Sequence, residues 1–198
     1  MEKIIILDFG SQTTQLIGRR VRELNTFCEI MPYNKFPKDD PDIIGVILSG
    51  SPLSVYADDA FHINFDEIRG KYPILGICYG SQLLAHMLGG KVATAPVSEY
   101  GKTEVEIVKK DSPLFKDVKD KTICWMSHTD YIAEAPAGFT VTAKTPVCPV
   151  AGMEDASRGL YAVQFHPEVM HTEEGTKMLQ GFVYGVCGCK GDWQMTSF

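Results

Sequence analysis

The stretch PILGICYGSQ at residues 73–82 decides how this chain is expected to fold. Its first five residues predict a strand buried on both faces, and residues 79–88, with one apolar face, predict a helix. Cys78 therefore lies on the turn between the two, flanked by Gly76 and Gly80. This arrangement is typical of a nucleophile elbow, in which a Ser or Cys occupies a strained turn between strand and helix.

The two glycines of this motif have a steric reason. The turn brings the backbones of strand and helix into contact, and a Cβ at Gly76 or Gly80 would collide there. The helix N-terminus also favours the thiolate of Cys78, because unpaired backbone N–H groups and the helix dipole stabilise negative charge. The motif thus predicts a cysteine nucleophile, the alternative being an inert cysteine buried at a glycine-rich turn.

Strands and helices alternate around this motif as far as residue 90. Apolar stretches predict strands at residues 3–7, 28–31 and 43–48, and helices at residues 12–24 and 59–69. Shorter strand-like segments and a closing helix follow at residues 91–95, 102–108, 122–126, 139–143, 159–165 and 173–186. The order predicts an α/β fold, with an open, mostly parallel, twisted sheet, helices on both faces and antiparallel additions.

The composition excludes several classes of function. The chain has 198 residues, 44% of them hydrophobic, which suits a single globular domain. Its net charge is −6 with no basic cluster longer than a pair, so we expect no nucleic-acid partner. It has no apolar run of membrane-spanning length, and Asp8 interrupts the first apolar stretch, which argues against a membrane segment and a signal peptide. We therefore expect a cytoplasmic protein with six free thiols and, with only Cys187 and Cys189 closely spaced, no metal site.

A cysteine nucleophile needs a base that a third group holds in one orientation. Two of the five histidines have an acid two residues later: His128 with Asp130, and His166 with Glu168. The second pair is favoured, because Pro167 keeps His166 out of the helical region and the preceding strand delivers it to the carboxyl edge of the sheet. His128 remains the alternative base.

Backbone N–H groups are expected to form an oxyanion hole beside the nucleophile. One donor is the N–H of Tyr79, the residue directly after Cys78. The segment SGSP at residues 49–52 follows the neighbouring strand and offers a second donor, at Ser51. The alternative for this segment is an ordinary β-turn.

Taken together and in this order, these motifs resemble the class I (triad-type) glutamine amidotransferases. The resemblance runs from residue 3 to about residue 186 and rests on GICYGSQ at 76–82, QFHPE at 164–168 and SGSP at 49–52. Other segments are similar, more narrowly, to the glutaminase domains of GMP synthetases: ILDFGSQ at 6–12, QLI at 15–17, RRVRE at 19–23, WMSH at 125–128 and VQFHPEV at 163–169.

The resemblance implies hydrolysis of L-glutamine through a thioester on Cys78, with His166 as general base and acid and Glu168 orienting it. It also implies substrate-binding roles for Gly50, Gln82, Ser127 and His128. Two departures stand out. The family's usual Gly-Gly-Pro is Gly-Ser-Pro at residues 50–52, and its Ser-His-Gly-Asp is Ser-His-Thr-Asp at residues 127–130, so each replaces a conformationally free glycine.

The same resemblance implies that residues 1–189 form a glutaminase domain and that residues 190–198 begin a linker toward a synthetase (ATP pyrophosphatase) domain, which this chain lacks. In GMP synthetases that domain activates XMP with ATP and magnesium and uses the ammonia. No cofactor is then expected for this chain, whose partner would be the synthetase domain or subunit. The chain would be part of a larger protein, a separate subunit or a stand-alone paralogue.

Three other interpretations stay open at this point. The chain could be the glutaminase of a different amidotransferase, or a γ-glutamyl hydrolase acting on larger amides. It could also be a non-catalytic regulatory module that has kept the fold, although all three triad positions are present.

Overall fold

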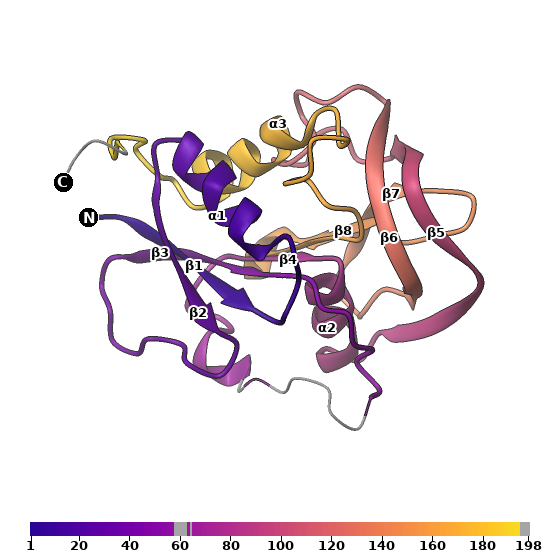
Figure 1. The fold of residues 1–198 in the computed structure, drawn as a ribbon, viewed down its shortest axis with the longest axis horizontal. Helices are drawn as coiled ribbons and strands as arrows, with labels where there is room; N and C mark the ends of the chain where they lie inside the picture. Colours follow the sequence, from indigo (N-terminus) through magenta and orange to yellow (C-terminus); the bar gives the residue numbers. More distant parts are fainter. Residues whose placement is uncertain (58–62, 64, 195–198) are drawn as a thin grey trace.

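The computed structural model describes residues 1–57, 63 and 65–194. Its strands are β1 (Lys3–Asp8), β2 (Phe27–Pro32), β3 (Ile43–Leu48), β4 (Ile74–Ile77), β5 (Lys91–Ile107), β6 (Lys121–Glu134), β7 (Thr140–Lys144), β8 (Gly152–Asp155) and β9 (Leu160–Val163). Its α-helices are α1 (Thr14–Glu23), α2 (Tyr79–Met87) and α3 (Gly175–Gln180). Figure 1 shows their arrangement.

The described strands form one nine-stranded sheet in the order β2-β1-β3-β4-β9-β8-β7-β5-β6. From β2 to β9 the five neighbours run parallel. From β9 to β6 every pairing is antiparallel. The prediction of an open, largely parallel sheet with antiparallel additions is therefore confirmed.

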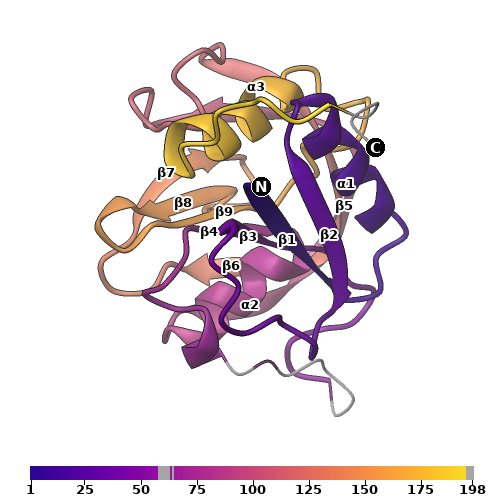
Figure 2. The ribbon, with the colours of Figure 1, turned by 90° about the vertical axis from the view of Figure 1, so that its left-hand side faces the viewer.

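Helices cover both faces of the sheet, with α1 and α3 on one side and α2 on the other (Figure 2). Strand β1 shows the consequence: Ile4 and Ile6 join the core beneath α1 and α3, whereas Ile5 and Leu7 join the core beneath α2. A continuous apolar strand is what such burial on both faces requires. Among the described residues, no helix is long and apolar enough to cross a membrane.

Two strands differ from expectation. The strands expected at residues 91–95 and 102–108 are one irregular strand, β5, because the chain passes through Gly101 at a φ of +102° without leaving the sheet. Strand β8 was not expected, since its sequence GMED has neither an apolar run nor a polar alternation. It is buried throughout and pairs with β7 and β9.

Two helices also differ. The helix expected at residues 173–186 divides into α3 and a π-helical turn, Gly181–Val186. The helix expected at residues 59–69 falls partly on residues 58–62 and 64, outside the described residues. Within the described part of that range, Phe65–Glu67 form a single 3₁₀ turn.

The chain beyond residue 189 stays against the domain as far as Trp193. That side chain is 8% exposed, its ring centroid lies 5.8 Å from that of Phe27, and its N–H donates to the Asn25 carbonyl at 3.1 Å. Residues 195–198 of the expected linker lie outside the described residues, and the boundary at residue 189 stays a prediction.

The elbow between β4 and α2 depends on two close backbone approaches. A Cβ on Gly76 would lie 2.5 Å from the carbonyl oxygen of Gly80, and a Cβ on Gly80 would lie 2.4 Å from that of Leu48. Both contacts are with backbone of packed elements, which cannot give way as a flexible side chain could. The steric reason inferred for the two glycines therefore holds in the structure.

We expect Gly80→Ala to lower the free energy of unfolding by about 1–3 kcal/mol, because the added methyl group must force α2 away from β3. Urea unfolding followed by circular dichroism measures the change. Gly185→Ala is the matched control, since its Cβ would meet only Pro113 Cβ at an ordinary 3.7 Å. Equal stability of the two variants would contradict this account of the elbow.

Candidate active site

Cys78 occupies the turn between β4 and α2 in a strained conformation, with φ 54° and ψ −110°. Backbone contacts on both sides hold it there. Its N–H donates to the Val163 carbonyl at 2.9 Å, and its own carbonyl accepts from the Ser81 N–H at 3.0 Å and hydroxyl at 2.6 Å. The expected nucleophile elbow is thus present, with the thiol at the N-terminus of α2.

His166 and Glu168 follow β9 at the carboxyl edge of the parallel strands. His166 Nδ1 lies 2.9 Å from Glu168 Oε2, and both residues are buried. The backbone around them is fixed by three contacts: the His166 N–H donates to Trp125 O, the Thr172 hydroxyl donates to His166 O, and Arg20 Nε donates to Glu168 O. The structure therefore brings His166, rather than His128, to the nucleophile.

The protonation of His166 is set by its two neighbours. Burial opposes a charge on the ring, but hydrogen bonds to Cys78 and Glu168 outweigh it and raise the pKa of His166 to about 10. Glu168 Oε1 has no hydrogen-bond partner among the described residues, so the carboxylate serves His166 alone. At neutral pH the arrangement favours a thiolate beside an imidazolium.

Cys78 lies between two cavities. The first, of about 480 Å³, is lined by Cys78 together with Ser51, Gln82, Ser127 and His128 among others. The second, of about 360 Å³, shares Cys78, Ser51 and Ser127 but opens on the side of His166. A substrate in the first cavity would therefore place its reacting atom between the thiol and the base.

The segments expected to form the oxyanion hole both lie at the first cavity. Tyr79 begins α2 directly after Cys78, and Ser51 lies in the segment after β3. The Ser51 hydroxyl accepts from the Leu53 N–H at 3.1 Å, which fixes the turn. Gly50 is buried, and a Cβ there would lie 3.5 Å from His166 Cε1, so this segment packs directly against the base.

His128 lines the first cavity, yet both of its ring nitrogens are engaged. Nδ1 lies 2.7 Å from the Asp130 carbonyl oxygen, and Nε2 lies 2.8 Å from Glu99 Oε1. Its side chain is 2% exposed. Neither ring nitrogen is free for a ligand, so a role of this segment in binding falls to the backbone of Ser127 and His128.

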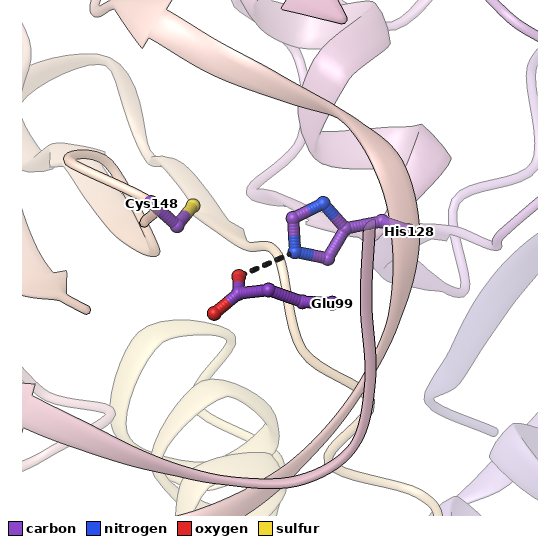
Figure 3. A group of neighbouring side chains, drawn as sticks. All are labelled: Glu99, His128 and Cys148. Carbon is purple, nitrogen blue, oxygen red and sulfur yellow. Dashed lines mark hydrogen bonds and ion pairs between the residues drawn. The ribbon is translucent and has the colours of Figure 1, made fainter. Parts of the chain in front are cut away.

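Glu99, His128 and Cys148 form a cluster that sequence reasoning missed, because it joins β5, β6 and the segment after β7 (Figure 3). Their possible ligand atoms all lie within 4.8 Å of one another, and these are donor types that hold Zn²⁺. Hydrogen bonds engage the first two residues, while burial and then the charge of Glu99 raise the pKa of Cys148 to about 12. A protonated thiol beside a bonded His–Glu pair accounts for the cluster without an ion.

Gln164 is a further buried polar residue that the sequence did not single out. It follows β9 directly, is 0% exposed, and its Nε2 lies 3.5 Å from Cys78 Sγ. Its Oε1 accepts from Gln82 Nε2 at 3.1 Å. The signal that could have found it is one amide side chain at the end of an apolar strand, immediately before the candidate base.

A family model of class-I glutamine amidotransferases matches residues 5–186. The chain belongs to this family. All six cysteines of this amidotransferase are free thiols, as expected.

Named relatives agree with the assignment. A glutamine-hydrolyzing GMP synthase of Clostridium botulinum is 59% identical over 98% of this chain, and one of Bacteroides thetaiotaomicron is 58% identical over all of it. The chain spans 38% and 39% of the lengths of these two relatives.

Solved structures show the same fold. A GMP synthase subunit from Thermoplasma acidophilum has a TM-score of 0.81 and 33% identity, over 95% of this chain and 94% of that chain. A glutamine amidotransferase from Thermotoga maritima has a TM-score of 0.75 at 18% identity, over 95% of this chain and 99% of that chain, a likeness of fold.

We expect Glu168→Gln to lower the pKa of His166 below its value of about 10, because the amide still accepts from Nδ1 but no longer offers the charge that stabilises an imidazolium. Titration of the imidazole by ¹⁵N NMR measures the shift. Glu173→Gln, an exposed acid nearby, is the control and should leave the midpoint unchanged.

The same shift has a consequence for stability. Because the pKa of His166 in the folded protein lies above its ordinary 6.5, the stabilisation is complete below pH 6.5 and is lost as the pH rises toward 10. Glu168→Gln should reduce this loss. A titration midpoint and an alkaline loss of stability equal to those of the wild type would contradict the role of Glu168.

Proposed function

We propose that this chain hydrolyses L-glutamine to glutamate and ammonia through a γ-glutamyl thioester on Cys78. The observation that carries the proposal is the series of Cys78, His166 and Glu168 beside a cavity of about 480 Å³. Nucleophile, base and orienting acid in this order are the parts that covalent amide hydrolysis requires.

In the first half-reaction the Cys78 thiolate attacks the side-chain carbonyl carbon of glutamine. The carbonyl oxygen becomes an oxyanion, which the backbone N–H groups of Tyr79 and Ser51 would stabilise. The His166 imidazolium then donates its proton to the departing nitrogen, so that ammonia leaves and the thioester remains. The second cavity opens at His166, and we infer that ammonia leaves on that side.

In the second half-reaction His166, now neutral, takes a proton from a water molecule whose oxygen attacks the thioester carbonyl. The carbon–sulfur bond breaks, glutamate is released, and the thiolate beside an imidazolium is restored. Glu168 keeps Nδ1 as the donor throughout, so the second ring nitrogen faces the reacting atoms. No step requires a cofactor in this chain.

We further propose that the ammonia serves the amination of XMP to GMP by a synthetase domain or subunit using ATP and magnesium, in the cytoplasm. Two findings support this acceptor. Relatives 58–59% identical are named GMP synthases, and the chain spans only 38–39% of their length, which leaves room in them for a synthetase domain. The binding roles of Gly50, Gln82, Ser127 and His128 belong to the same proposal.

Cys78→Ala should abolish glutamate release from glutamine while leaving the fold intact, because the thiol is small and its loss leaves only a small void. A coupled glutamate assay and circular dichroism measure the two effects. Cys124→Ala, which removes a buried thiol in β6, is the control and should retain turnover. Residual turnover in Cys78→Ala equal to that of Cys124→Ala would refute the proposed nucleophile.

Addition of a synthetase domain from a GMP synthase relative, loaded with XMP, ATP and magnesium, should accelerate glutamate release by this chain and yield GMP. Ser51 and Thr129 stand where glycines are usual in the family, and positive φ costs other residues about 1 kcal/mol or more, so the oxyanion hole would be incomplete without a partner. One oxyanion donor is worth about 10²–10³-fold in turnover. Full-rate hydrolysis that the loaded domain does not change would indicate a stand-alone glutaminase or γ-glutamyl hydrolase instead.

A further inference from the structure

The orientation of the Gln164 side chain is fixed from outside the triad. Gln82 Nε2 lies 2.9 Å from the Asp130 carbonyl oxygen, an acceptor only, so this end of Gln82 must be its NH₂ group. The second proton of that group points to Gln164 at 3.1 Å, which requires the Gln164 oxygen there. The NH₂ group of Gln164 therefore faces Cys78 Sγ, at 3.5 Å.

The Asp130 carbonyl that starts this series is itself held in place. His128 Nδ1 lies 2.7 Å from it, and Glu99 fixes the ring from the other side at 2.8 Å, as Figure 3 shows. The series thus runs from Glu99 in β5, through His128 and Asp130 in β6, to the start of α2 and the end of β9. Three separate elements combine to aim one N–H group at the sulfur.

A donor at this place distinguishes the two forms of Cys78. A thiolate accepts hydrogen bonds and donates none, so the Gln164 N–H stabilises it. A thiol can donate to the Ser127 carbonyl at 3.7 Å and gains less from a second donor. Since Gln164 is completely buried, no water replaces the bond if the amide is lost.

We propose that Gln164 donates a hydrogen bond to the sulfur of Cys78 and thereby maintains the reactive thiolate, and that Gln82 is a positioning residue which fixes the Gln164 amide in the donating orientation. The inference rests on the proposed role of Cys78 as nucleophile. It assigns Gln82 a second task beside the glutamine cavity.

Other titratable groups surround the sulfur and contribute to its titration in every variant. From the segment after β9 come His166 and, behind it, Glu168. From the segment after β7 comes the protonated thiol of Cys148, which interacts with the charge of Cys78. From β6 and β5 come the His128 and Glu99 pair, in contact with each other. The contribution of Gln164 is therefore read from the difference between variants.

The test is the rate of alkylation of Cys78 by iodoacetamide between about pH 5 and 10, followed by mass spectrometry of the Cys78 peptide in the full chain. Gln164→Glu replaces the donor with a carboxylate of the same shape and should raise the midpoint by about one pH unit or more. Gln164→Met removes the donor and keeps an unbranched apolar side chain, and should raise it less. Gln180→Glu, at an exposed position in α3, is the matched control and should leave it unchanged.

Gln82→Met should also raise the midpoint, by less than Gln164→Glu, because the Gln164 amide is then free to rotate. Wild-type midpoints in both Gln164 variants would overturn the proposal, and a wild-type midpoint in Gln82→Met alone would overturn the positioning role. If circular dichroism shows that Gln164→Glu does not fold, Gln164→Met decides. A wild-type Cys78 no more reactive than an ordinary thiol would instead contradict the proposed nucleophile, so the two failures are distinguishable.

Discussion

The contact between the start of α2 and the backbone of β3 is the constraint on which the site depends. No side chain fits at Gly76 or Gly80, and this allows the helix to begin within contact of the sheet. Cys78 is thereby held at positive φ, with hydrogen bonds from its backbone to β9 and into α2. The strain at one residue is maintained by the packing of three elements, and it places the thiol at the carboxyl edge of the parallel strands.

The sheet order then supplies the rest of the site. Because β9 lies parallel to β4, the segment that follows it carries Gln164, His166 and Glu168 past Cys78. The long strand β6 extends over the same edge and presents residues 127–130 to the cavity. Catalytic and binding groups thus come from segments far apart in the sequence, and the antiparallel part of the sheet contributes one wall.

The parts that could be predicted from the sequence are those written in local patterns. The strand, turn and helix around Cys78 follow from apolar runs and two glycines, and the preference for His166 over His128 followed from Pro167 and the preceding strand. The residues that were missed act through contacts between distant segments. Gln164 lies in what reads as an apolar strand, and the pairing of Glu99 with His128 depends on the register of β5 with β6, which no local pattern determines. Strand β8 was missed for the same reason, since its partners rather than its residues make it a strand.

The central claim is that Cys78, set on this turn, forms the covalent intermediate. The most direct measurement is to mix the full chain with isotopically labelled glutamine, quench in acid and map the modified peptide by mass spectrometry. A labelled glutamyl group on Cys78, and on none of the other five cysteines, is the predicted result. Glutamate release without any adduct on Cys78, or with the adduct on a different cysteine, would contradict it.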